Sequence, residues 1–164
     1  MAGIGAMVGR RLTEILTSES GVGPSAAQAC LAAGITMPAV LRGQVVAQNV
    51  AADVTEKTAG AKYPAVHVYC DRLTNSLREK FRQFSGTARM VVEARVSQER
   101  LEGIELRTQV LADAITDVLD QSRGDWGQGM FFAGGYEVSY APVKHGGRNF
   151  IQIAKITFEV NVSQ

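Results

Sequence analysis

The sequence predicts an α/β (α+β) protein, with a mostly antiparallel sheet of about four to five strands packed by one long helix and a helical segment at the N-terminus. Three observations lead to this prediction. Residues 149–164 and residues 87–98 alternate apolar and polar side chains, which is typical of strands with one buried face. Residues 100–121 instead repeat apolar side chains at helical spacing. Half-buried strands of this kind belong to antiparallel sheets that a helix covers on one side.

The composition is that of an ordinary globular chain. Its 164 residues suit one domain, and 46% hydrophobic with 20% charged residues argues against overall disorder. The net charge of +1 gives no overall attraction to nucleic acid or to acidic membranes. No apolar run approaches the roughly 20 residues that span a bilayer, and we expect no secretory signal. Cys30 and Cys70 lack pairing spacing, so we expect reduced thiols and a protein made in a cytoplasm.

Residues 1–42 are expected to form an N-terminal helical extension, followed by an α+β domain over residues 43–164. Residues 3–17 carry an apolar helical stripe, formed by Ile4, Val8, Leu12, Ile15 and Leu16. Pro24 can open a second helix, which runs to Ala33 and which Gly34 ends as a C-terminal cap.

The next segment contains one clear strand. Residues 43–57 have only a weak strand-like pattern, and residues 58–62 are expected to form a loop. A short strand over residues 65–70 then places Val66, Val68 and Cys70 on one face.

A polar stretch separates this strand from a second one. Residues 71–86 are polar and basic and too long for a tight hairpin loop, so we expect a short helix or an ordered excursion. Residues 87–98 form the second strand. Its inner face consists of Ala88, Met90, Val92, Ala94 and Val96, and its outer face of Arg89, Glu93, Arg95 and Ser97.

The last third of the chain is expected to contain a helix and a closing pair of strands. The helix over residues 100–121 buries a stripe consisting of Leu101, Ile104, Leu111, Ala114, Ile115, Val118 and Leu119. A strand over residues 136–140 and a glycine turn at 145–147 lead into the final strand, whose buried face consists of Phe150, Ala154, Ile156, Phe158, Val160 and Val162. Ile151 and Ile153 are apolar on the otherwise polar face, which makes them candidates for contact with a neighbouring subunit.

Charge is divided between two regions of this unit. Residues 72–95 hold six basic and two acidic side chains, a net +4, and residues 101–125 hold two basic and six acidic ones, a net −4. Such a division suits head-to-tail association of identical copies. The alternative is that both regions are simply solvated surface.

No motif predicts catalysis, a cofactor or a metal site. The glycines at positions 3, 5 and 9 lack the preceding strand of a phosphate-binding loop. His67 and His145 have no metal-ligand spacing to the cysteines, and no nucleophile signature accompanies the acidic residues of 101–125. We therefore expect no enzyme. An enzyme would need a pocket in which His67 or Asp71 meets a nucleophile.

A nucleic-acid-binding module remains an alternative from another class. The basic stretch 72–95 contains Phe81 and Phe84, and aromatic side chains among cations can stack on single-stranded nucleic acid. Phenylalanines spaced by three residues more often anchor a loop to the core, and the acidic helix would oppose nucleic acid.

The order of these elements resembles the tail terminator proteins of long-tailed bacteriophages. The resemblance rests on the segment Tyr63–Tyr69, the strand Thr87–Gln98, the helix Leu101–Gln121 and the closing pair Tyr136–Tyr140 and Phe150–Val162, and it covers roughly residues 43–164. Related neck and head-completion proteins share a similar small α/β architecture.

This resemblance implies a structural virion protein, assembled in the host cytoplasm, at the junction of tail and neck. Terminators form a homohexameric ring that caps the tail tube, stops its polymerisation and offers a docking surface to the head or neck. DNA passes through the lumen without specific binding, and no membrane takes part. The candidate contacts in such a ring are Arg78, Lys80 and Arg82 of one subunit against Asp113, Asp117 and Asp120 of the next.

Overall fold

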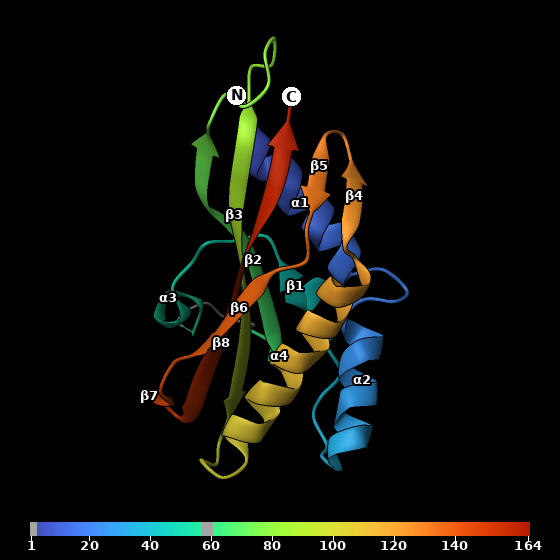
Figure 1. Ribbon diagram of the computed structural model, residues 1–164. Helices are drawn as coiled ribbons and strands as arrows, with labels where there is room; N and C mark the ends of the chain where they lie inside the picture. Colours follow the sequence, from blue (N-terminus) through green and yellow to red (C-terminus); the bar gives the residue numbers. More distant parts are fainter. Residues whose placement is uncertain (1–2, 57–60) are drawn as a thin grey trace.

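A computed structural model describes residues 3–56 and 61–164, and in this part the chain is a mixed α/β protein (Figure 1). Its helices are α1 (Ile4–Leu16), α2 (Val22–Ala33), α3 (Ala52–Glu56) and α4 (Ile104–Gln121), with a 3₁₀ turn at Arg42–Gln44. Its strands are β1 (Val45–Val46), β2 (Ala65–Asn75), β3 (Ser85–Gln98), β4 (Gly124–Gly127), β5 (Met130–Phe132), β6 (Tyr136–Tyr140), β7 (Lys144–Gly146) and β8 (Asn149–Ser163).

The sheet is built around β8. One edge of β8 pairs with β3 along its whole length, from Phe150 opposite Gln98 to Ser163 opposite Ser85. Its other edge pairs in turn with β7, β6 and β5, and β4 follows β5. β2 continues the sheet beyond β3, and β1 lies parallel to β2. The described sheet is therefore mixed and has eight strands, more than the four to five expected, because several strands are too short to show alternation.

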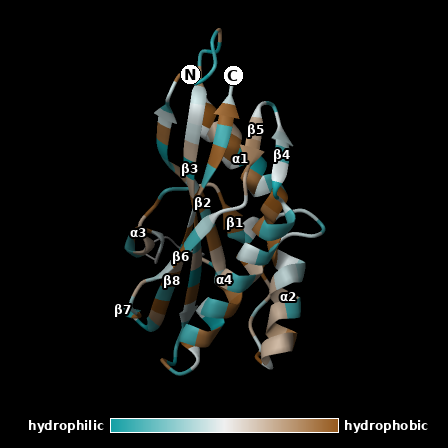
Figure 2. Cartoon of the chain, viewed as in Figure 1, coloured by the Kyte–Doolittle hydropathy of each residue, from teal (hydrophilic) through white to brown (hydrophobic). Residues whose placement is uncertain are grey.

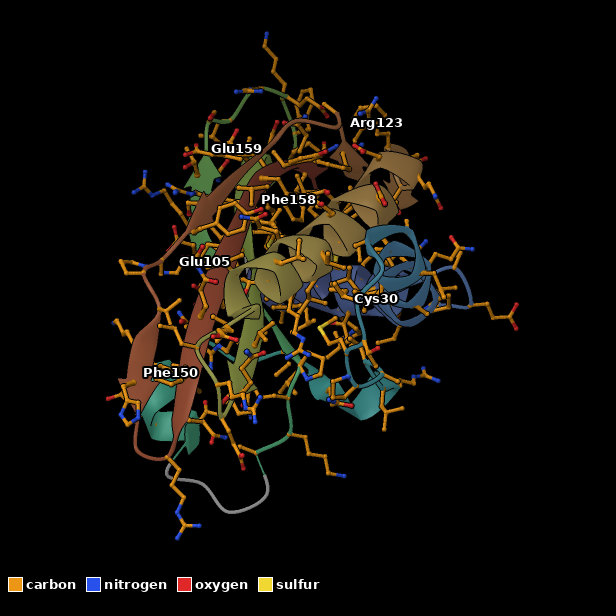
Figure 3. The ribbon with its side chains drawn as sticks, turned by 90° about the horizontal axis from the view of Figure 1, so that it is seen from below. Cys30, Glu105, Arg123, Phe150, Phe158 and Glu159 are labelled. Carbon is orange, nitrogen blue, oxygen red and sulfur yellow. The ribbon has the colours of Figure 1, made fainter. Side chains whose placement is uncertain are left out.

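Two helices cover one face of this sheet, and a third packs beside them. α1 lies over β2 and β3, where Gly5 faces Cys70 and Gly9 faces Met90, while α4 lies over β3 and β8. α2 packs against α4, and all three lie on the same side in Figure 3, where Phe158 is on the helix side of β8 and Glu159 on the other. The alternation along β8 is visible in the hydropathy colouring of Figure 2.

The burial pattern confirms the predicted inner faces of the two long strands. The inner residues of β3 are all buried, and so are the predicted core residues of β8 except Phe150, which is partly buried and packs against the core. On α4 the predicted stripe from Ile104 to Leu119 is buried, but Leu101 lies before the helix and is exposed.

The N-terminal helices belong to the same core as the sheet. α1 and α2 confirm the two predicted helices, and Gly34 ends α2 in the left-handed conformation, with φ of 67°. Val8, Leu12 and Leu16 are fully buried in the same hydrophobic cluster as the sheet residues. The division at residues 42 and 43 stays a prediction from the sequence.

Three segments differ from the expectations. Of residues 43–57, only Val45–Val46 forms a strand and 52–56 is a helix, while 57–60 lie outside the described residues. The polar stretch 71–86 holds no helix: β2 continues to Asn75, β3 begins at Ser85, and the loop between them is the ordered excursion that was the second expectation. A β4–β5 hairpin, for which no strand was expected, buries Trp126, Met130 and Phe132. No helix in the described segments is long and apolar enough to cross a membrane.

Candidate interaction surfaces

The loop between β2 and β3, residues 76–84, forms an ordered tip to this hairpin and is called the hairpin tip below. Asn75 organises it: the side-chain oxygen accepts from the backbone N–H groups of Leu77 and Ser85 at 3.2 and 3.1 Å, and the amide donates to the carbonyl of Gln83 at 3.0 Å. The C-terminal residue Gln164 accepts from the N–H groups at the end of the tip. The tip is thus held by the strands at its base.

Two apolar side chains of the hairpin tip face solvent. Phe81 is fully exposed and Leu77 is 65% exposed. Both have positive φ, 67° and 47°, a conformation that costs a non-glycine residue about 1–2 kcal/mol. Phe84, by contrast, is completely buried. The expectation that both phenylalanines anchor the loop is therefore confirmed for Phe84 and wrong for Phe81.

The predicted interface cations Arg78, Lys80 and Arg82 all lie in the hairpin tip and are exposed. Arg82 approaches the Glu79 carboxylate at 3.5 Å, and Glu79 also accepts from the Ser163 hydroxyl at 2.7 Å. The tip holds three basic side chains and one acidic one, so its surface is positive.

The predicted acidic residues Asp113, Asp117 and Asp120 are exposed along one side of α4. Two tyrosines of β6 lie beside them. The hydroxyl of Tyr136 donates to Asp120 at 3.3 Å, and Asp120 also forms an ion pair with Arg123 at 3.1 Å. Tyr136 and Tyr140 are 38% and 43% exposed, so the acidic stripe continues into an aromatic surface.

The electrostatics of this stripe favour a cation. Partial burial, and then the neighbouring Asp117 carboxylate, raise the pKa of Asp113 above its ordinary value. Partial burial, and then the charge of Asp113, raise the pKa of the Tyr140 hydroxyl. Burial is the larger cause of both shifts and the neighbouring carboxylates add to it, so a basic group placed here would favour the charged form of Asp113.

The basic and acidic surfaces lie in different parts of one molecule. In Figure 1 the hairpin tip is the green loop at one end of the elongated sheet, whereas α4 and β6 lie in the other half. Of the two isoleucines proposed for subunit contact, Ile151 is buried within the chain and Ile153 is partly buried. Little side-chain surface is therefore exposed at these two positions for contact with another subunit.

Sequence reasoning missed a buried polar cluster on the sheet face opposite α4. Arg95 and Glu93 were expected to face solvent, but both are buried and form an ion pair at 3.1 Å. Arg95 also donates to the Val50 carbonyl and, at 3.2 Å, to the Thr55 hydroxyl. The prediction that Glu93 and Arg95 face solvent is wrong because the segment around α3 packs over this part of the sheet.

His67 and Tyr69 lie on the same face as this ion pair. Burial, followed by the charge of Arg95, lowers the pKa of His67 from its ordinary value of 6.5. Burial, followed by the charge of Glu93, raises the pKa of Tyr69 to about 12. His67 is almost completely buried. Burial therefore favours the uncharged form of both rings.

An open groove of about 750 Å³ lies between α1 and the outer edge of β2. Small residues of α1 and the strand residues Val68, Tyr69 and Cys70 line it. A second groove, of about 430 Å³, lies beside His67. Within the described residues, no three histidine, cysteine or acidic side chains come together as a metal site would require.

Comparisons with known proteins give no relative: no protein-family model matches the chain, and no curated protein matches it.

Proposed function

We propose that this protein is a structural virion protein that acts as a tail terminator, capping the end of a phage tail tube. The observation that carries the proposal is the presence of two exposed, oppositely charged surfaces in separate parts of one chain. Arg78, Lys80 and Arg82 project from the hairpin tip, and Asp113, Asp117 and Asp120 line α4. Surfaces arranged in this way complement each other between copies rather than within one copy.

The mechanism is one of surface complementarity. Six copies associate head to tail into a ring at the junction of tail and neck. One face of the ring covers the last ring of tube protein and stops its growth, and the other receives the head or neck. The net charge of +1 suits a lumen through which DNA passes without being held. A neck or head-completion protein would use the same surfaces with a different partner.

Mass in solution and tube length test this proposal together. The protein is examined by native mass spectrometry alone and with its cognate tail-tube protein, and tube lengths are measured by electron microscopy. We expect a six-fold assembly on tube ends and arrested tube growth. Tubes that grow to the same length with and without the protein would exclude capping, and binding to a neck component instead would identify the related class.

Nucleic-acid binding is kept as a second candidate because Phe81 is fully exposed among three cations. Aromatic stacking on bases typically contributes about 1–3 kcal/mol per base. This function predicts a single-stranded DNA affinity that falls steeply with salt and falls further in Phe81→Ala. Affinity that is equally weak in both proteins at low salt would remove the candidate.

A further inference from the structure

The hairpin tip presents its apolar side chains in a prepared conformation. Phe81 and Leu77 are exposed at the tip, and the hydrogen bonds of Asn75 fix the backbone that carries them. Glu79 ties the tip further, through its N–H to the Ser85 hydroxyl at 3.2 Å and its carboxylate to Ser163. A rigid tip loses little conformational freedom on docking, so its exposed ring is well suited to bind a partner.

The α4–β6 face, formed by Leu106, Asp113, Asp117, Asp120, Tyr136 and Tyr140, has the complementary character. Leu106 is 45% exposed and lies two helical turns before Asp113 on the same side of α4. Tyr136 and Tyr140 stand beside the carboxylates on β6. This face therefore offers apolar and aromatic contact area surrounded by negative charge, whereas the tip offers an aromatic ring surrounded by positive charge.

We infer that Phe81 of one copy docks between α4 and β6 of a second copy, with Arg78, Lys80 and Arg82 meeting the three aspartates around it. The second copy is the occupant because charge and apolar character match on both sides of this contact. A copy cannot reach its own α4–β6 face, since the tip and that face occupy opposite halves of the molecule (Figure 1). Central aromatic side chains ringed by polar contacts carry most of the binding energy at protein interfaces.

This contact is heterologous, because the tip and the α4–β6 face are different surfaces of the same chain. Each copy would give its tip to one neighbour and receive the tip of another, which generates a ring when the rotation closes. The inference deepens the proposed function and rests on its self-association. It adds a specific anchor, Phe81, to a contact otherwise based on charge.

Photo-cross-linking from position 81 tests the contact directly. Phe81→p-benzoylphenylalanine places the reactive group on an exposed side chain, and the same replacement at Leu31, an exposed residue of α2, serves as the control. We expect cross-links from position 81 to residues 106–140 of a second copy, and none to that region from position 31. Cross-links only to tail-tube protein or DNA, or none at all, would overturn the inference.

The contribution of Phe81 to the strength of self-association is tested by a separate measurement. In sedimentation experiments we expect Phe81→Ser to weaken self-association at least tenfold and Leu31→Ser to change it by less than twofold. Equal association of Phe81→Ser and the unmodified chain would overturn the anchor role. If that variant still caps tubes and the chain forms rings, only this inference fails. If the unmodified chain neither self-associates nor caps tubes, the proposed function fails with it.

Discussion

Arg95 is the largest fully buried side chain in the described part of the chain, and its guanidinium connects the sheet to the segment that covers it. It pairs with Glu93 two residues away on β3 and donates to Val50 and Thr55 across the contact. Burying a guanidinium is costly, and it persists only where charge and hydrogen bonds compensate it. Arg95 therefore acts as a clamp that holds the chain around α3 against the sheet.

Replacing this clamp is expected to be severely destabilising. Arg95→Met leaves the Glu93 carboxylate buried without its partner, and we expect a loss of about 3–5 kcal/mol in the free energy of unfolding. Urea denaturation measures it. Arg89→Met is the matched control, because the Arg89–Asp71 pair at 3.5 Å is exposed, so its loss should cost no more than about 1 kcal/mol. Similar losses in the two variants would contradict the clamp.

The sequence could not place Arg95 correctly for a physical reason. Because side chains alternate along β3, Arg95 points to the other face of the sheet from Ala94. A charged side chain on that face is ordinarily solvated. The segment that buries it, from Val50 to Thr55, has only a weak pattern in the sequence. Phe81 was mispredicted in the other direction, because it was expected to be buried and is exposed. Nothing in the spacing of the two phenylalanines distinguishes Phe81 from the buried Phe84.

At the scale of elements, long periodic segments were predictable and short or interrupted ones were not. β3, α4 and β8 were each located to within a few residues because their patterns extend over three turns or more of helix, or a dozen strand residues. The predicted strand over residues 65–70 ended before β2 does, because a bulge between Cys70 and Arg72 breaks the two-residue period. Beyond the bulge Leu73 returns to the helix side, opposite Ala88.

The close approach of β2 and β3 at the base of the hairpin tip requires a glycine. A Cβ at Gly86 would lie 1.8 Å from the backbone carbonyl oxygen of Thr74, which cannot move aside without disturbing the strand pair. We expect Gly86→Ala to lower the free energy of unfolding by about 1–3 kcal/mol and to speed amide exchange in the tip. Gly43→Ala, with no atom within 4 Å of the added carbon, is the control. Equal stability of the two variants would contradict this packing.

At the scale of the whole molecule, one core supports two separated charged surfaces. α1 and α2 pack into the cluster that also holds β3 and β8, so the N-terminal helices help to fix the position of α4. The charge tally was enough to predict the exposed aspartates and cations. It could not predict that Tyr136 and Tyr140 stand beside the aspartates, because that depends on β6 pairing with β8. The division of charge was thus predictable from the sequence, whereas the aromatic surface beside the aspartates follows only from the fold.

The contribution of charge to the proposed self-association is expected to depend on salt concentration. Asp117→Lys reverses one charge in the middle of the acidic stripe, and at low salt we expect self-association to weaken about tenfold, a change of about 1.4 kcal/mol. The Debye length falls from about 10 Å at 0.1 M salt to about 3 Å at 1 M, so the difference from the unmodified chain should shrink as salt rises. Asp53→Lys, which reverses an exposed charge on α3, should leave association unchanged. Sedimentation at several salt concentrations separates these outcomes. If Asp117→Lys associates like the unmodified chain at every concentration, the acidic stripe is solvated surface, and the pairing with Arg78, Lys80 and Arg82 is wrong.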